Sequence, residues 1–227
     1  MRKVLLAVSA ASIALGACTV AAPVETASAP PPPPPPAELG DPDPYYFNMV
    51  LPPKDASGTY VTPNTDIGPL ETMFHFRSAM NVGALSCRSK PGMDMTDAYN
   101  AFIKKFKTTL ANANKQVEAK FIRENARGKR ARDRHMTSLY NHFARPATLD
   151  QFCPVAFEHL RAANELPTGV GALQDYSMIA LAEIESIYQD HFDQVRDYQI
   201  AFRERMRENG QTPPPMPAAA AAPAAPA

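Results

Sequence analysis

Proline is concentrated at the two ends of this chain, and its distribution limits the fold more than any other feature of the sequence. Of the 24 prolines, only five lie between residues 66 and 208. Because proline lacks a backbone N–H and interrupts the interior of a helix, long helices are confined to this middle segment, whereas the ends suit linkers and tails. We expect one domain over residues 45–210, which is long enough to form a hydrophobic core.

Apolar residues in the middle segment recur every three or four positions, which is the spacing of an amphipathic helix. These stripes predict helices over residues 69–87, about 94–127, about 128–145, 149–160 and 168–209. The last helix, of about 40 residues, would extend about 60 Å. We therefore expect an all-α fold, an elongated bundle of four to five helices with two long helices. An irregular N-terminal arm with a short strand at 58–61, and disordered Pro/Ala-rich ends that include the tail 211–227, complete this prediction.

The first 17 residues have the composition of a secretory signal peptide. Two cations, Arg2 and Lys3, precede an apolar stretch that ends in small residues, an order typical of such signals. As a helix, residues 4–17 would extend about 21 Å, which is too short to cross a hydrocarbon core of about 30 Å. The signal peptide is therefore expected to span residues 1–17, and the chain to be exported.

The tetrapeptide Leu15-Gly16-Ala17-Cys18 resembles the lipobox of Gram-negative lipoproteins. The resemblance implies that Cys18 is acylated and becomes the first mature residue, and that the anchor lies in the outer membrane facing the periplasm, because Thr19 is not aspartate. Ordinary signal cleavage a few residues downstream is the alternative, although a proline would then follow the cut. Residues 18–44 contain seven consecutive prolines and would form a semi-rigid tether.

With Cys18 assigned to lipidation, Cys87 and Cys153 remain. A pair of cysteines in an exported protein is typical of a disulfide, and both lie on helix faces that we expect to be buried. In the chain-entropy model, closing a loop of about 66 residues would stabilise the fold by about 4 kcal/mol. Two free buried thiols or a reactive pair are the alternatives, but neither cysteine belongs to a Cys-x-x-Cys motif. We predict a structural disulfide.

The sequence contains no nucleophile elbow, phosphate-binding loop or His-Glu-x-x-His zinc helix, which are the motifs that identify common catalytic sites. We therefore assign no catalytic residue, no metal ligand and no cofactor. The alternative hypothesis, a catalytic or metal site, rests on His135, His142 and His159. The first two lie seven residues apart on one predicted helix, and the third could approach them in space. Together with a carboxylate they would suit acid/base or metal chemistry, although scattered surface histidines are the plainer interpretation.

One local charge anomaly interrupts an otherwise neutral composition of 23 basic and 23 acidic residues. Residues 120–134 contain seven basic and two acidic residues, a net charge of +5. The candidate anion-binding residues are Arg127, Lys129, Arg130 and Arg132. Their natural partners in an envelope would be lipopolysaccharide phosphates, anionic headgroups or cell-wall carboxylates. The alternative is pairing within the bundle, since residues 158–208 carry an excess of acids.

These observations favour a non-enzymatic envelope lipoprotein that acts as a scaffold or interaction module on a proline-rich tether. Its partners would be the membrane through the lipid anchor and an envelope protein or cell-wall component, whereas nucleic acid is disfavoured by the compartment. A long apolar seam also suits a homo-oligomer. Residues 60–63 and 79–84 resemble segments of exported Gram-negative proteins, a resemblance that implies no function. The alternatives are an anion- or cell-wall-binding module, through residues 120–134, and an envelope hydrolase that uses a histidine/carboxylate cluster.

Overall fold

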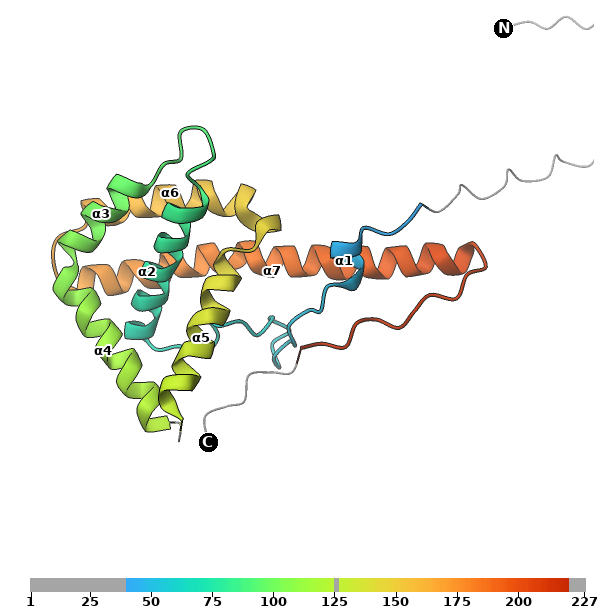
Figure 1. The fold of residues 1–227 in the computed structure, drawn as a ribbon, viewed down its shortest axis with the longest axis horizontal. Coiled ribbons are helices and arrows are strands. Elements are labelled where there is room, and N and C mark those ends of the chain that lie inside the picture. Colours follow the sequence, from blue (N-terminus) through green and yellow to red (C-terminus); the bar gives the residue numbers. More distant parts are fainter. Residues whose placement is uncertain (1–39, 125–126, 221–227) are drawn as a thin grey trace, which may run out of the picture. The chain divides into compact units, whose positions relative to one another are not determined.

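A computed structural model describes residues 40–124 and 127–220 and shows that their regular structure is helical (Figure 1). The predicted signal peptide, Cys18 and the tether up to residue 39 lie outside the described residues. The helices are α1 (Pro44–Asn48), α2 (Pro69–Ser86), α3 (Thr96–Lys105), α4 (Lys107–Glu124), α5 (Gly128–Phe143), α6 (Leu149–Glu165) and α7 (Val170–Glu208), with a short 3₁₀ turn at Pro146–Thr148. The all-α prediction is confirmed.

Helix α2 is the centre of the bundle, since it contacts α3, α4, α5, α6 and α7. Six consecutive residues of this helix, 71–76, are buried, so α2 is enclosed on all sides and lacks the single apolar face of a surface helix. Pro69 occupies the first turn, where its missing N–H removes no helical hydrogen bond. The polar side chains of α2 must therefore find partners inside the protein.

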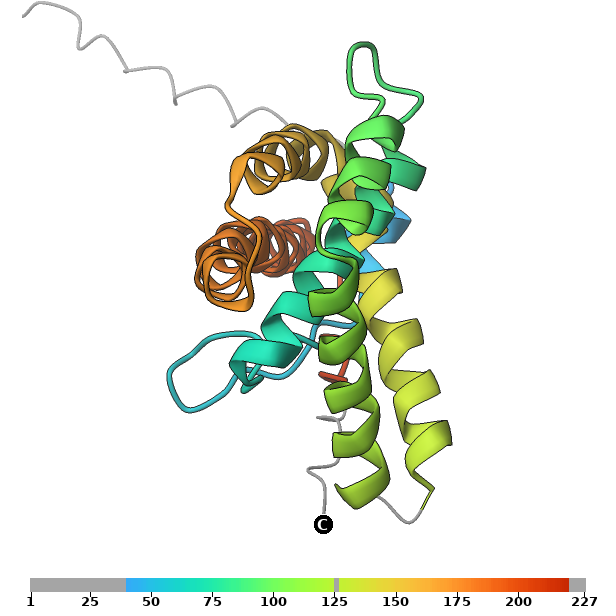
Figure 2. The ribbon, with the colours of Figure 1, turned by 90° about the vertical axis from the view of Figure 1, so that its left-hand side faces the viewer.

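The single long helix expected over residues 94–127 is two helices, α3 and α4, which meet at Phe106. The backbone leaves helical geometry there, with φ of −103° and ψ of 20°. The break has a packing reason: α3 packs mainly on α6 and also touches α2, whereas α4 packs on α2 and α5. Figure 2 shows α4 and α5 side by side as a hairpin. The apolar face of this segment changes its packing partner at Phe106. One straight helix could not keep that face packed on both sets of neighbours.

The predicted disulfide between Cys87 and Cys153 is confirmed. It joins the C-cap of α2 to α6, both cysteines are fully buried, and their Cα atoms are 5.7 Å apart. The bond closes a sequence separation of 66 residues, so it restricts the unfolded chain over the segment that contains α3, α4 and α5,.

The N-terminal arm packs on the C-terminal half of α7. Gln199 donates hydrogen bonds from its side-chain amide to the carbonyl oxygens of Tyr46 and Met49, at 2.8 and 2.9 Å. The short strand expected at 58–61 is an isolated antiparallel bridge between Lys54 and Tyr60. A strand needs a second strand with which to form a hydrogen-bonded ladder, and here the arm lies beside a helix instead.

The Pro/Ala-rich tail has no helix or strand over its described part, residues 211–220. These residues nonetheless make specific contacts, which the prediction of a disordered tail did not anticipate. Arg203, which is 3% exposed, donates to the carbonyl oxygens of Pro214 and Pro215. Prolines keep a carbonyl acceptor although they lack a donor, so a buried arginine can hold a proline-rich segment. No helix of the described residues has the length and apolar character required to cross a membrane.

Candidate metal centre

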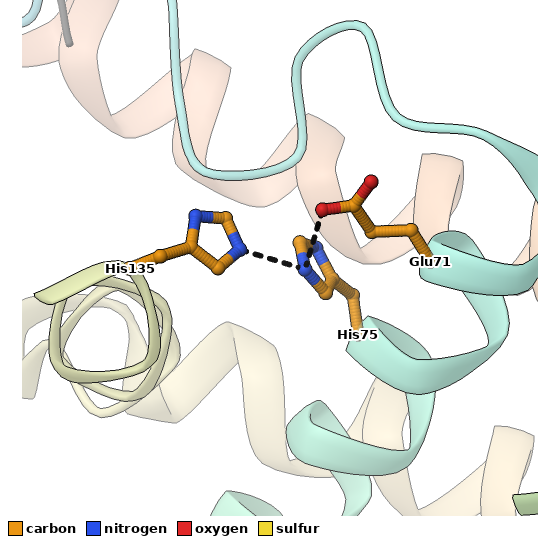
Figure 3. A group of neighbouring side chains, drawn as sticks. All are labelled: Glu71, His75 and His135. Atoms are coloured by element: carbon orange, nitrogen blue, oxygen red, sulfur yellow. Dashed lines mark hydrogen bonds and ion pairs between the residues drawn. The ribbon is translucent and has the colours of Figure 1, made fainter. Parts of the chain in front are cut away.

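Three side chains that could ligate a metal ion converge between α2 and α5. Glu71 and His75 come from α2, and His135 comes from α5 (Figure 3). Residues four apart on a helix lie on one face, so Glu71 and His75 project in the same direction toward α5. Glu71 belongs to the first turn of α2, where the partial positive charge of the helix N-terminus favours a carboxylate.

The donor atoms of these residues lie close together. One ligand atom from each of the three residues lies within 4.8 Å of the other two. Nε2 of His75 is 3.0 Å from Nε2 of His135 and 4.0 Å from Oε1 of Glu71. Donors bound tetrahedrally to zinc at about 2.0–2.1 Å are about 3.3 Å from one another. The two separations that involve His75 bracket this value, so small side-chain movements would bring these donors to coordination distance.

Asn64, in the loop before α2, determines which nitrogen of His75 faces His135. Its Nδ2 donates to Oε2 of Glu185 at 2.6 Å, and its Oδ1 lies 2.8 Å from Nδ1 of His75. An ionised carboxylate can only accept, so the amide orientation is settled and Nδ1 of His75 must carry the proton. Nε2 of His75 therefore presents a lone pair toward His135, which is the arrangement seen when a second-shell carbonyl orients a metal-ligating histidine.

The Glu185 carboxylate is suited to this role. Burial raises the pKa of Glu185, but the hydrogen bond and charge of His142, with a further hydrogen bond from Asn64, outweigh burial and leave the pKa below its ordinary value. Nε2 of His142 lies 3.0 Å from the same Oε2 that accepts from Asn64. The carboxylate is therefore ionised at neutral pH and acts as a pure acceptor.

Both imidazoles of the candidate centre are neutral near pH 7. Burial is the main cause that lowers the pKa of His75 to about 3, and the neighbouring His135 and Lys120 contribute in the same direction. Burial also lowers the pKa of His135, against the opposing charge of Glu71. A metal ion binds the neutral form of imidazole, so neither ring has to lose a net proton. Because Nε2 of His75 holds a lone pair, Nε2 of His135 donates the hydrogen bond between the rings, and its proton must move to Nδ1 before that nitrogen can ligate,.

Glu71 carries the charge of the centre and is only 5% exposed. Nζ of Lys120, on α4, donates to Oε2 of Glu71 at 2.6 Å. A buried carboxylate without a partner would be costly, and the ammonium compensates it. The other oxygen, Oε1, is the one that lies toward His75.

Two nitrogen donors and one oxygen donor match the chemistry of zinc and related divalent transition metals. Three protein ligands leave one tetrahedral position for water or another ligand. The residues therefore fit a metal ion in donor type, in number and in spacing. Because the donors belong to two helices, a bound ion would cross-link α2 to α5.

The histidines named from the sequence do not form one cluster. His135 lies against His75, whereas His142 lies against Glu185. On α6, Nδ1 of His159 is 2.9 Å from the Tyr176 hydroxyl and its Nε2 is 3.3 Å from Glu183. They are separated because His135 and His142 lie seven residues apart on α5, whereas His159 lies on α6.

The candidate anion-binding residues are also divided. Arg127, Lys129 and Arg130 are exposed at the start of α5 and line a shallow surface hollow. None of these three forms an ion pair with another described residue. Arg132 is partly buried and donates to Oδ1 of Asn114 at 2.8 Å. The expected patch therefore consists of three cations, and the fourth belongs to the α4–α5 contact.

Glu71 and His75 were not assigned from the sequence. Their signal was present, since a carboxylate and a histidine four residues apart form a common ligand pair on one helix. Only the placement of α5 against α2 reveals the third donor. Comparison of the chain with protein-family models, with curated proteins and with solved structures finds no match.

Proposed function

We propose that the helical domain binds a divalent transition-metal ion of the zinc type through Glu71, His75 and His135. The observation that carries this proposal is the convergence of the three donor atoms within 4.8 Å. The hydrogen bond from His75 to Asn64 supports it, because it leaves the inward nitrogen free to ligate,. The ion would act by joining α2 to α5, or as cargo that the domain carries.

We further propose that this activity belongs to an exported protein, anchored in the cell envelope through Cys18 and acting as a non-enzymatic scaffold or interaction module. The N-terminal sequence supports export and lipidation. The disulfide between Cys87 and Cys153 supports export as well, because disulfides persist in oxidising compartments. On this proposal, metal binding stabilises the helical domain by joining α2 to α5, and the tether presents that domain to its partner.

Metal binding is tested by titrating the purified domain with Co²⁺, whose visible absorption reports tetrahedral ligation, and with Zn²⁺ in competition with a chelator. We expect one ion per chain in the unaltered protein. His135→Gln, at a partly buried position, removes one donor and should weaken binding at least tenfold. His159→Gln is the matched control, since it changes a histidine outside the centre. Equal binding by both variants would contradict the assignment.

A second candidate function is capture of phosphate-bearing envelope lipids by Arg127, Lys129 and Arg130. The observation that favours it is their joint exposure around one hollow. A triple substitution to glutamate should abolish sedimentation with anionic vesicles, and the binding of the unaltered protein should weaken with salt. The matched control for net charge is a triple substitution to glutamate of Lys115, Arg161 and Arg207, which are exposed outside this surface. Vesicle binding that persists after the triple substitution would exclude this surface.

A further inference from the structure

Lys120 occupies one oxygen of the carboxylate that the metal would need. Its Nζ lies 2.6 Å from Oε2 of Glu71, while Oε1 of the same carboxylate lies toward His75. The two side chains differ in exposure: that of Glu71 is 7% exposed, whereas that of Lys120 is 33% exposed. Glu71 is thus held in the core, and Lys120 reaches it from the solvent side.

The ammonium and a divalent ion would be bound by the same small anion. The two cations would lie on the two oxygens of one carboxylate, where they would repel each other strongly. Solvent and salt screen this repulsion poorly because the site is partly buried. The positive potential of Lys120 already extends to the other donors. Burial is the main reason for the low pKa values of His75 and His135, and the charge of Lys120 lowers both further. A group that disfavours a proton on both imidazoles also disfavours a metal ion between them.

Resting on the metal site proposed above, we propose that Lys120 is a tethered cation that neutralises Glu71 when the site holds no metal and is displaced when metal binds. The side chain is suited to this exchange, because a lysine has a flexible stem and a strongly hydrated head that can return to water. Glu71 has no such freedom within α2. Exchange therefore moves the lysine and leaves the ligands in place.

Such an exchange regulates the site in two ways. Without metal, Lys120 compensates Glu71 and joins α4 to α2; with metal, the ion takes over the compensation and joins α5 to α2. Metal must compete with the Lys120 ammonium, whose local concentration is very high. The affinity of the site for metal is therefore lower than the three donors alone would give. The site would fill only when free metal exceeds that threshold.

The alternative role for Lys120 is that of an outer-shell partner, which orients the Glu71 carboxylate while Oε1 ligates the metal. The two roles predict opposite effects of removing the charge. Competition predicts tighter binding in Lys120→Gln, and orientation predicts weaker binding. Lys120→Arg retains the charge and should behave like the unaltered protein under the first role.

The experiment measures Zn²⁺ and Co²⁺ affinities by chelator competition for the unaltered chain, Lys120→Gln, Lys120→Arg and Lys115→Gln. Lys115 is an exposed lysine on the same helix, so its variant is the control for net charge. We expect Lys120→Gln to bind about tenfold more tightly, within the range of measured coupling between two ligands, and the other two variants to stay within about twofold. Equal or weaker binding by Lys120→Gln would overturn the competitor role.

A second measurement follows Lys120 directly. Acylation of its amine, quantified by peptide mass spectrometry, should be slow in chelator and faster at saturating Zn²⁺, because the displaced ammonium enters solvent. Lys115 should react at the same rate in both conditions. If metal binds and Lys120 stays protected, the exchange is disproved while the metal site stands. If no variant binds metal, the site itself is disproved, and the exchange with it.

Discussion

Oδ1 of Asn64 accepts a hydrogen bond from Nδ1 of His75 across 2.8 Å. A loop residue eleven positions earlier in the chain thereby settles the tautomer of a histidine that is fully buried in α2. The direction of this bond follows from Glu185, which holds the other end of the Asn64 amide. The inward nitrogen of His75 is left with its lone pair, whether or not a metal is bound.

Asn64→Ala should weaken metal binding by about 10- to 100-fold, the usual effect of removing a second-shell partner. The donors stay in place, but His75 loses the group that orients it. Chelator competition with Co²⁺ measures the change. In metal-free protein, ¹⁵N NMR of the His75 ring should report the Nδ1–H tautomer only while Asn64 is present. The exposed Asn141→Ala on α5 should alter neither result, and an unchanged tautomer in Asn64→Ala would refute the orientation.

Gly128→Ala should lower the free energy of unfolding by about 1–3 kcal/mol, the range for overpacked sites. A Cβ at residue 128 would lie 2.5 Å from the carbonyl oxygen of Phe121 and 2.6 Å from Cα of Ile122. These are backbone atoms of α4, so α5 would have to move away. Urea denaturation measures the effect.

Gly171→Ala is the matched control, because a Cβ there meets no atom within 4 Å. Alanine favours the helical backbone of α7, so this variant should be neutral or slightly stabilising. Equal destabilisation by the two substitutions would show that the close approach of α5 to α4 is not the cause.

Stability should fall as the pH drops below about 6.5, in part through His191. Burial, and then the positive charge of Arg145, lower the pKa of His191 in the folded state. The Tyr45 hydroxyl on α1 lies 3.3 Å from Nε2 of this ring, and Tyr46 packs nearby. The unfolded chain binds the proton more tightly, so this contribution is complete above the unfolded pKa and is lost as the pH falls toward the folded pKa.

The pH effect is measured by comparing urea denaturation of the unaltered protein and His191→Gln between pH 4.5 and 8. The difference between them should reach at most about 1.4 kcal/mol per pH unit below pH 6.5, the limit for one proton. Parallel curves for the two proteins would rule out His191 as a contributor.

Arg203→Ala should detach the tail while leaving the bundle folded. The guanidinium of Arg203 donates to Pro214 and Pro215 and lies 4.2 Å over the ring of Phe47. Its removal takes two hydrogen bonds from the tail and the contact with Phe47 from α1. Limited proteolysis should then cleave the tail faster, with little change in helical circular dichroism. Arg207→Ala, exposed on the same helix, should not change the rate, and a tail equally protected in both variants would contradict this role.

Much of the helical architecture could be predicted from the sequence, because it depends on local properties. The position of Pro69 at the start of α2 follows from its fixed φ and missing donor. The spacing of apolar residues predicted α2, α5, α6 and α7, and a pair of cysteines in a chain expected to be exported predicted the disulfide. The period of a helix is a property of consecutive residues, so it needs no knowledge of the rest of the fold.

The tertiary structure decided what those faces meet. The break at Phe106 exists because α3 and α4 have different neighbours, and periodicity alone does not record a change of partner. The ligand pair Glu71 and His75 could be read from spacing, but His135 joins it only because α5 lies across α2. Local sequence thus determined which side chains share a helix face, whereas side-chain packing between distant segments determined which faces meet, and with them the candidate metal centre.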